Sequence, residues 1–290
     1  MSYEPHDRLV NAARAGRDGL GTLLMGFVSI AALAYLTSNL FYGTLYGIVA
    51  PEDPNWLSGG TTAGGMLALL FGFGAWIVAI ALTVILIHRR AFSGLLGAGS
   101  VPQFRKVLWA VILLHAVVMF LPPWTITEGV TPARPFGQWA TLLPVALIAV
   151  FIQVSAEELL FRGYLQSQLA ARFKSPLVWI GVPTVLFAMG HYNPEAGENA
   201  WVFVIWAAVF GALMADLTAR SGALGPAIAV HMVNNIFALL ILSPPDTMSG
   251  LALYHYPFAL SDAAAVRALL PIDFAMLFLM WLAARLALRP

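Results

Sequence analysis

The sequence has no cysteine and little charge. The absence of Cys from its 290 residues excludes disulfide bonds, thiolate metal ligands and cysteine nucleophiles. Asp, Glu, Lys and Arg together make up 10% of the chain, whereas soluble domains carry about 25% charged residues. The net charge of +1 gives no electrostatic basis for binding nucleic acid, so we expect no nucleic-acid partner.

Hydrophobic residues make up 60% of the chain and gather in long runs. One run, residues 19–51, contains no charged residue and exceeds the ~20 apolar residues that a transmembrane helix needs. The composition therefore predicts an all-α, polytopic membrane protein that is surrounded by the lipid bilayer. We expect about eight transmembrane helices, at approximately Leu20–Val49, Thr62–Ile87, Val107–Leu121, Trp139 to beyond Glu158, Pro176–His191, Ala200–Leu217, Ala223–Leu242 and Leu269–Leu288.

The basic residues are unevenly distributed between the two sides of these spans. If the N-terminus lies in the cytoplasm and the spans alternate, all but two of the 15 Lys and Arg residues fall on the cytoplasmic side, the exceptions being Arg134 and Arg267. Such a bias is the main orientation signal of membrane proteins. We therefore expect a multi-pass protein of a plasma membrane, such as a bacterial inner membrane, with both termini in the cytoplasm.

We expect one membrane domain made of three consecutive segments. Residues 1–138 would hold the first three spans, residues 139–242 the next four, and residues 243–290 an outer loop and the last span. The most polar spans lie in the middle segment. Asp273 follows Pro271 near the expected start of the last span, where a carboxylate can cap a helix.

Five polar residues of the middle segment lie deep within the expected spans: Glu157, Glu158, His191, His231 and Asn235. Charged side chains at the bilayer centre cost ~3 kcal/mol or more and are functional candidates by default. Counting about 1.5 Å per residue from the basic residues at the cytoplasmic ends places Glu157, His191 and Asn235 roughly 22–25 Å deep, and His231 roughly 16 Å deep. Three helices thus carry polar residues to a similar level, which predicts one shared site.

Helical spacing predicts different positions for the two carboxylates. Glu158 and Arg162 are four residues apart, with the acid on the N-terminal side, which favours an ion pair. Glu157 lies about 100° around the helix and is free to face a substrate or water. His231 and Asn235 are also four residues apart and share a face, while Phe187 precedes His191 by one turn and could form a wall of the site.

Two kinds of chemistry suit these residues. A desolvated Glu paired with a His can hold and deprotonate a water molecule, and a second His with an Asn amide can stabilise an oxyanion. This set can hydrolyse an amide without a covalent intermediate, and we expect it to need no cofactor. Two His and one Glu are also a known catalytic zinc set, although the HExxH spacing is absent. A zinc-dependent site therefore stays as an alternative.

Three motifs together give the sequence a family resemblance. Glu157-Glu158-x-x-x-Arg162, Phe187-x-x-x-His191 and His231-x-x-x-Asn235 resemble the motifs of the CPBP intramembrane peptidases. This family contains the CAAX prenyl endopeptidases of the Rce1-like type and bacterial Abi-like relatives. The resemblance covers about residues 140–240, and every motif position matches.

The resemblance implies an eight-helix peptidase with a catalytic cavity inside the bilayer. It implies that the residues matching Glu157 and His191 activate water and that those matching His231 and Asn235 form the oxyanion hole, with Glu158, Arg162 and Phe187 in support. The implied reaction is endopeptidase cleavage of a protein or peptide at the membrane, including a prenylated CAAX-type substrate.

Two other functions stay open at this stage. A transporter would also place ionisable residues at mid-depth, but it should show two corresponding halves, and here the polar residues gather in the second half. A non-catalytic scaffold or immunity protein on the same fold would act by binding alone. The sequence leaves the substrate, the cleavage site and the oligomeric state open.

Overall fold

The chain forms a bundle of membrane-spanning helices. The structure is a computed structural model that describes residues 2–49, 51, 56–121 and 128–289. Six helices in the described residues are long and apolar enough to cross a membrane, and two shorter apolar helices accompany them at Pro176–Met189 and Gly225–Ile241. The prediction of a helical, polytopic membrane protein is thus confirmed, whereas the number of eight spans is not.

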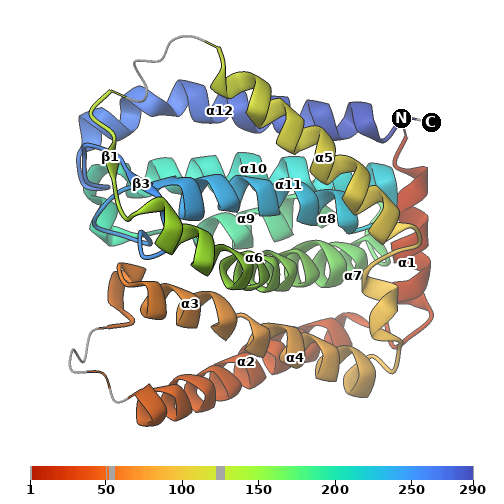
Figure 1. Ribbon diagram of the computed structural model, residues 1–290. Helices are drawn as coiled ribbons and strands as arrows, with labels where there is room; N and C mark the ends of the chain where they lie inside the picture. The colour runs from red at the N-terminus through yellow and green to blue at the C-terminus, as the bar shows by residue number, and fades with distance from the viewer. Residues whose placement is uncertain (1, 50, 52–55, 122–127, 290) are drawn as a thin grey trace.

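The N-terminal third supplies three of the long helices. Its elements are η1 (Glu4–His6), α1 (Asp7–Arg14), α2 (Leu20–Val49), η2 (Ser58–Gly60), α3 (Ala63–Gly72), α4 (Gly74–Leu82), η3 (Thr83–Ile87), η4 (Phe92–Leu95) and α5 (Ser100–Met119). The helices α3, α4 and η3 together form one span, Ala63–Ile87. In Figure 1, α2, α3 and α4 form a layer at the bottom of the bundle, while α5 runs obliquely from the top of the view down towards the end with the chain termini.

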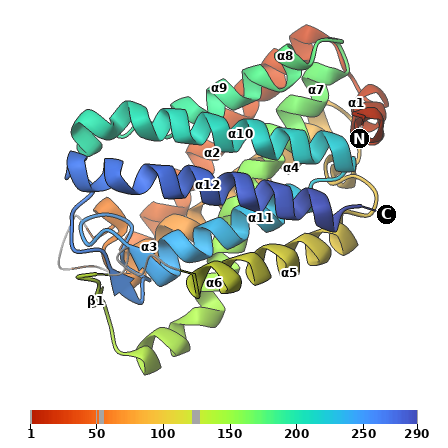
Figure 2. The same ribbon diagram turned by 90° about the horizontal axis from the view of Figure 1, so that it is seen from above.

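The middle of the chain supplies two long and two short helices. Its elements are β1 (Thr131–Pro132), α6 (Phe136–Glu158), η6 (Leu159–Gln166), α7 (Ser167–Ala170), α8 (Pro176–Trp179), α9 (Gly181–Met189), η7 (Pro194–Asn199), α10 (Ala200–Ser221), α11 (Gly225–Asn235) and η8 (Ile236–Ile241). The helices α6, η6 and α7 form one span of 35 residues, Phe136–Ala170. This span runs through the interior of the bundle (Figures 1 and 2).

The C-terminal elements are β2 (Leu242–Ser243), β3 (Tyr254–His255) and α12 (Ala263–Ala287). Strand β3 pairs antiparallel with β1 and parallel with β2, which gives a small sheet of order β1-β3-β2. The sheet lies at the end of the bundle away from the chain termini (Figure 1). Arg134 fastens this end because its guanidinium donates to the carbonyl oxygens of Gly250 and Ala252.

The last helix begins earlier than the sequence analysis expected. It starts at Ala263 rather than near Leu269. Asp262 caps it by accepting a hydrogen bond from the backbone N–H of Ala265 at 3.0 Å. Asp273, which we expected to cap the helix, lies inside it, because Pro271 is accommodated within the helix and does not mark its start.

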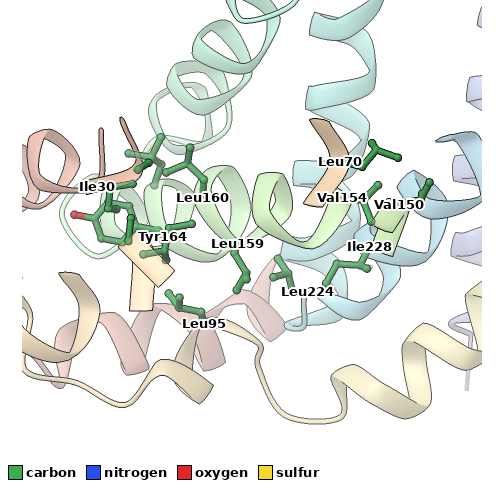
Figure 3. Close-up of a cluster of buried hydrophobic side chains, with 14 of the residues drawn as sticks. Ile30, Leu70, Leu95, Val150, Val154, Leu159, Leu160, Tyr164, Leu224 and Ile228 are labelled. Carbon is green, nitrogen blue, oxygen red and sulfur yellow. The ribbon is translucent and has the colours of Figure 1, made fainter. Parts of the chain in front are cut away.

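Two hydrophobic clusters hold the three predicted segments of the chain together. One cluster includes Leu23, Leu160 and Leu251, and the other includes Val107 and Leu277. Figure 3 shows the first cluster around α6 and η6, where side chains of the N-terminal helices and of α11 meet. Each cluster draws on all three segments. Residues 139–242 therefore pack against residues from both flanking segments.

Many large apolar side chains point outward, as expected for helices that face lipid. Leu40, Ile48, Leu113 and Leu177 are between 65% and 85% exposed. In a soluble protein such extended apolar surface would indicate an interface or a liability to aggregate. On six long apolar helices it fits contact with lipid acyl chains.

Both chain termini lie at one end of the bundle, which we call the termini end (Figures 1 and 2). Basic side chains gather there. Arg14 donates to the carbonyl oxygen of Ala171, and Arg172 donates to that of Gly19. Arg220 pairs with Asp216 at 2.7 Å and lies over the ring of Tyr3. This gathering agrees with the predicted bias of basic residues toward one side of the membrane.

Candidate active site

The centre of the site is a buried carboxylate that pairs with two side chains. Glu158 ends α6, and its Oε1 atom accepts hydrogen bonds from Arg162 Nη1 and His231 Nδ1, each at 2.8 Å. Glu158 is 0% and Arg162 1% exposed. The Glu158–Arg162 pair therefore forms as helical spacing predicted. The packing of α11 against α6 adds His231 to it.

Glu157 is the less engaged carboxylate of the two. Its side chain is 16% exposed, and its Oε2 atom lies 3.6 Å from His231 Nε2. That separation is within ion-pair range but too long for a hydrogen bond, and Oε2 has no hydrogen-bond partner among the described residues. Because Arg162 neutralises Glu158, Glu157 is the carboxylate left free to accept a proton.

His191 lies beside Phe187, and its expected role with Glu157 in activating water stays a prediction. In the described part of the chain, the imidazole within 4.0 Å of Glu157 is that of His231. His191 is half-buried at the end of α9, and its Nδ1 atom donates to the carbonyl oxygen of Phe187 at 2.8 Å. With Nδ1 protonated, Nε2 of a neutral His191 carries a lone pair that can accept a proton.

Aromatic rings enclose the polar groups. The Phe187 ring lies 4.5 Å from the His191 ring and 6.3 Å from the His231 ring, so it adjoins both histidines. The Arg162 guanidinium lies over the same ring at 4.6 Å. Phe210 of α10 packs edge-on against His231 at 4.7 Å. These rings exclude water, which strengthens the charge interactions inside.

A glycine lets α10 approach the site closely. The carbonyl oxygen of Gly211 accepts a hydrogen bond from Arg162 Nη2 at 3.2 Å. A Cβ atom at this position would lie 3.3 Å from Phe187 and 3.4 Å from Arg162. Small residues allow such close contacts between membrane helices. Arg162 is thus held by a carboxylate, a carbonyl and an aromatic ring.

Asn235 belongs to a second hydrogen-bonded group beside the carboxylates. Its Nδ2 atom donates to Gln153 Oε1 at 2.8 Å, and its Oδ1 atom accepts from Asn234 Nδ2 at 3.1 Å. The sequence analysis missed Gln153 and Asn234. Gln153 could have been found, because it precedes Glu157 by four residues and is a polar residue in an apolar helix. One N–H of the Asn235 amide remains for another acceptor.

Both helices that carry the site change geometry directly after it. Segment η6 follows Glu158 and is a π-helix, and the π-helix η8 follows Asn235. Such wider turns are rare and are frequent at functional sites. Each π-helix changes the direction in which the following side chains point. Arg162 lies within η6 and still contacts Glu158. Neither π-helix was predicted from the sequence.

The structure brings together Glu157, Glu158, Arg162, His231 and Asn235, which we call the central site. Among the described residues, no group of three or more His, Asp or Glu side chains has the arrangement of a metal site. Two pockets stand out on the surface, one on α9 around Val182 and one on α12 around Arg285. Neither is lined by a residue of the central site, so the expected catalytic cavity stays a prediction.

Known families provide an independent comparison. Residues 139–237 match the family model described as type II CAAX prenyl endopeptidase Rce1-like. This part of the chain is Rce1-like. The match includes all seven motif positions, from Glu157 to Asn235, and confirms the family resemblance that the motifs indicated. Rce1-like proteins are a protease family, which supports a peptidase in general terms.

A bacterial relative extends the similarity beyond the Rce1-like region. The chain is 27% identical over 240 residues to the uncharacterized protein YyaK of Bacillus subtilis (strain 168). The alignment covers 79% of this chain and 78% of YyaK. No solved structure shows significant similarity to the chain. The helical architecture identifies an integral, multi-pass membrane protein, and residues 139–237 are similar to a protease family.

Proposed function

We propose that this protein is an intramembrane endopeptidase of the glutamate type, in which Glu157 activates water. The observation that carries the proposal is the difference between the two adjacent carboxylates. Glu158 is fully buried and its Oε1 atom accepts from both Arg162 and His231, whereas the Glu157 side chain is 16% exposed and its Oε2 atom lies 3.6 Å from His231 Nε2. The Oε2 atoms of both carboxylates lack a hydrogen-bond partner in the described structure. A general base needs a free acceptor atom near a site where water can sit, and Glu157 provides one.

The reaction follows from the neighbours of Glu157. Its carboxylate takes a proton from water, and the resulting hydroxide attacks the carbonyl carbon of the scissile peptide bond. The oxyanion that forms accepts a hydrogen bond from the second N–H of Asn235 and lies beside His231, whose Nε2 atom can donate to it when the imidazole carries both protons. When the C–N bond breaks, Glu157 returns the proton to the leaving nitrogen, so that the enzyme is regenerated.

His191 is proposed to share the work of positioning water. Its Nδ1 proton is held by the Phe187 carbonyl, so its Nε2 lone pair is available. The Phe187 ring adjoins both imidazoles, which places them on neighbouring sides of one aromatic wall. Of the two histidines, His231 lies beside Glu157 and His191 is the more peripheral.

The proposed substrate is a protein or peptide that lies in or at the membrane. The central site is buried among apolar helices, so a segment attached to lipid or crossing the bilayer can reach it with little exposure to water. A prenylated CAAX-type protein has this chemistry and corresponds to the description of the matched family. The hydrolysis is proposed to need no metal, since Glu157 supplies the base and Asn235 a neutral donor. Zinc dependence is the alternative.

A comparison of membrane proteomes tests the proposal. Cells that carry the wild-type protein and cells that carry Glu157→Gln are compared for membrane-associated proteins that accumulate uncleaved only with the variant. Arg105→Gln is the matched control, because Arg105 is exposed at the start of α5 and away from the site. Identical proteomes for Glu157→Gln and wild type, with equal amounts of folded protein, would contradict peptidase activity and favour a scaffold that acts by binding.

A further inference from the structure

A second group of buried polar residues lies at the termini end, outside the central site. We call it the terminal cluster and define it as His88, Arg90, Tyr164 and Arg172. His88 accepts from or donates to the Tyr164 hydroxyl at 2.9 Å through Nε2, and its Nδ1 atom donates to the carbonyl oxygen of Arg17 at 2.8 Å. The cluster therefore joins the end of the second span to the end of the α6–α7 span.

Arg90 is the unusual member of this cluster. It is 8% exposed, and its Nε, Nη1 and Nη2 atoms are all buried without a hydrogen-bond partner among the described residues. No described carboxylate lies within 4.0 Å of it. A buried charge without a partner is strongly unfavourable. An ionisable side chain without a protein partner in a membrane protein is therefore a candidate for binding a ligand of opposite charge.

Arg172 adds a second positive charge to the same place. Its Nη1 atom donates to Gln168 and its Nη2 atom to the Gly19 carbonyl, while its Nε atom is buried and lacks a partner. Burial, with Arg172 adding repulsion, lowers the pKa of Arg90 to about 10. Arg90 is therefore still charged at neutral pH. The two guanidinium groups thus repel each other, while the Asp18 carboxylate attracts Arg172. Four of their nitrogen atoms are buried without a hydrogen-bond acceptor among the described residues.

The position of the cluster indicates which acceptor fits. Arg90 follows the end of the second span, Ile87, and Arg172 follows the end of the fourth, Ala170. Both guanidinium groups consequently lie near the depth of the lipid headgroups, where phosphate groups are concentrated. Arginine forks bind phosphate oxygens with paired, charge-assisted hydrogen bonds. Arg172 is half-buried and Arg90 fully buried, so an anion would approach past Arg172.

We propose that the terminal cluster is a phosphate-binding site in which Arg90 and Arg172 hold the phosphate of a phospholipid headgroup or a free phosphate ion. The two sources share the same chemistry at the protein. The bound anion would neutralise Arg90 and fix the ends of the second and fourth spans against each other. Because no residue of the central site takes part, the inference stands apart from the proposed peptidase activity.

Binding to the purified, delipidated full-length protein tests the site. The probes are inorganic phosphate, with chloride at equal ionic strength as reference, and phosphatidylglycerol, with dioleoylglycerol as the lipid that lacks phosphate. Thermal unfolding and native mass spectrometry measure binding to wild type, Arg90→Gln, Arg172→Gln and the exposed control Arg105→Gln. We expect Arg90→Gln to weaken phosphate or phosphatidylglycerol binding about ten- to hundredfold and Arg105→Gln to leave it unchanged.

The pattern across the probes identifies the source of the phosphate. Binding of phosphatidylglycerol but not of inorganic phosphate, lost in Arg90→Gln, assigns a lipid headgroup. The reverse pattern assigns a free anion. If wild type, Arg90→Gln and Arg105→Gln respond alike to both probes, the site is refuted. If Arg90→Gln does not fold, binding of the same probes to Arg172→Gln tests the site instead. The expected loss of binding is then smaller, because Arg90 remains.

Discussion

The central site and the terminal cluster lie along the same span, Phe136–Ala170, and handle buried charge in opposite ways. In the central site, Arg162 is balanced by Glu158, and the remaining carboxylate, Glu157, faces His231. In the terminal cluster, Arg90 lies near Arg172 with no described carboxylate beside it. In the first group the buried cation is paired with a carboxylate, whereas in the second Arg90 has no ion pair within 4.0 Å among the described residues, although the Asp18 carboxylate attracts Arg172.

The difference teaches how depth governs polar residues in a membrane protein. In the hydrocarbon core no water or headgroup can neutralise a charge, so each one needs a partner from the protein. Glu158 and Arg162 meet this need, and Glu157 can stay free because it is slightly exposed. Near the headgroups, lipid phosphate can supply the missing charge. An incomplete cluster is therefore tolerable at the termini end but not at the centre.

The largest expected effect concerns the two adjacent carboxylates. Glu157→Gln should lower kcat/KM for peptide cleavage by about 10³-fold or more, because it removes the general base. Glu158→Gln should cost less, since a Gln oxygen can still accept from Arg162. The measurement is the cleavage rate of a membrane substrate at equal amounts of folded protein. Equal losses, or a larger loss for Glu158→Gln, would refute the division of roles.

Removing the internal counter-charge of the central site should destabilise the protein. Arg162→Met leaves Glu158 buried beside His231 alone, which should cost about 3–5 kcal/mol of unfolding free energy. The double variant Glu158→Gln/Arg162→Met should recover most of that loss, because no unpaired charge remains. Unfolding in mixed detergent micelles measures both. A double variant as unstable as Arg162→Met would show that lost packing, not charge, dominates.

The packing of the N-terminal segment at the termini end should depend on pH. Burial against Trp179 and Gln166 lowers the pKa of His6 from 6.5 to about 4. When residues 4–14 detach from the bundle, His6 regains its ordinary pKa and binds more protons between pH 6.5 and pH 4. The packing of this segment against the bundle is therefore fully stable above pH 6.5 and weakens as the pH falls toward 4. The loss should reach about 3 kcal/mol. Hydrogen exchange of residues 4–14, corrected for intrinsic rates, measures it.

A variant without the imidazole provides the control for this prediction. His6→Phe removes the titrating group while keeping a ring against Trp179, so the docking of residues 4–14 should lose its pH dependence in this range. The same pH dependence in His6→Phe and wild type would show that another group controls the docking.

Gln153 should have a moderate effect on catalysis because it acts through Asn235. Gln153→Ala removes the acceptor for Asn235 Nδ2, and the freed amide should stabilise the oxyanion less well, lowering kcat about tenfold with KM unchanged. Gln153→Glu keeps an acceptor oxygen and should restore part of the rate. A change in KM alone, or no rescue, would indicate a role in packing instead.

The smallest expected effect is that of chelation. If the central site works without a metal, strong chelators should leave the cleavage rate within about twofold of its value, since Glu157 supplies the base directly. The rate is measured before and after dialysis against chelator, with and without added zinc. Loss of activity on chelation and its recovery on zinc addition would favour the zinc-dependent alternative.

The sequence determined the features that depend on local spacing and solvent. Long apolar runs predicted the membrane helices, because a helix of about 20 apolar residues spans the hydrocarbon core and makes all of its backbone hydrogen bonds internally. The spacing of Glu158 and Arg162 predicted their ion pair, because residues four apart meet on any helix. The start of α12 was predicted less well than its end, because Pro271 does not interrupt the helix.

Only the tertiary structure decided which side chains from different helices meet. The packing of α11 on α6 placed His231, not His191, beside Glu157 and joined Asn235 to Gln153. The same packing of distant segments buried Arg90 without a partner. Helical periodicity fixes the face on which a residue lies, but the rotation and register between helices depend on the packing of the whole bundle. That packing turned a set of polar residues at similar depth into one carboxylate that is fully buried and paired with Arg162 and His231, and one that is partly exposed beside His231.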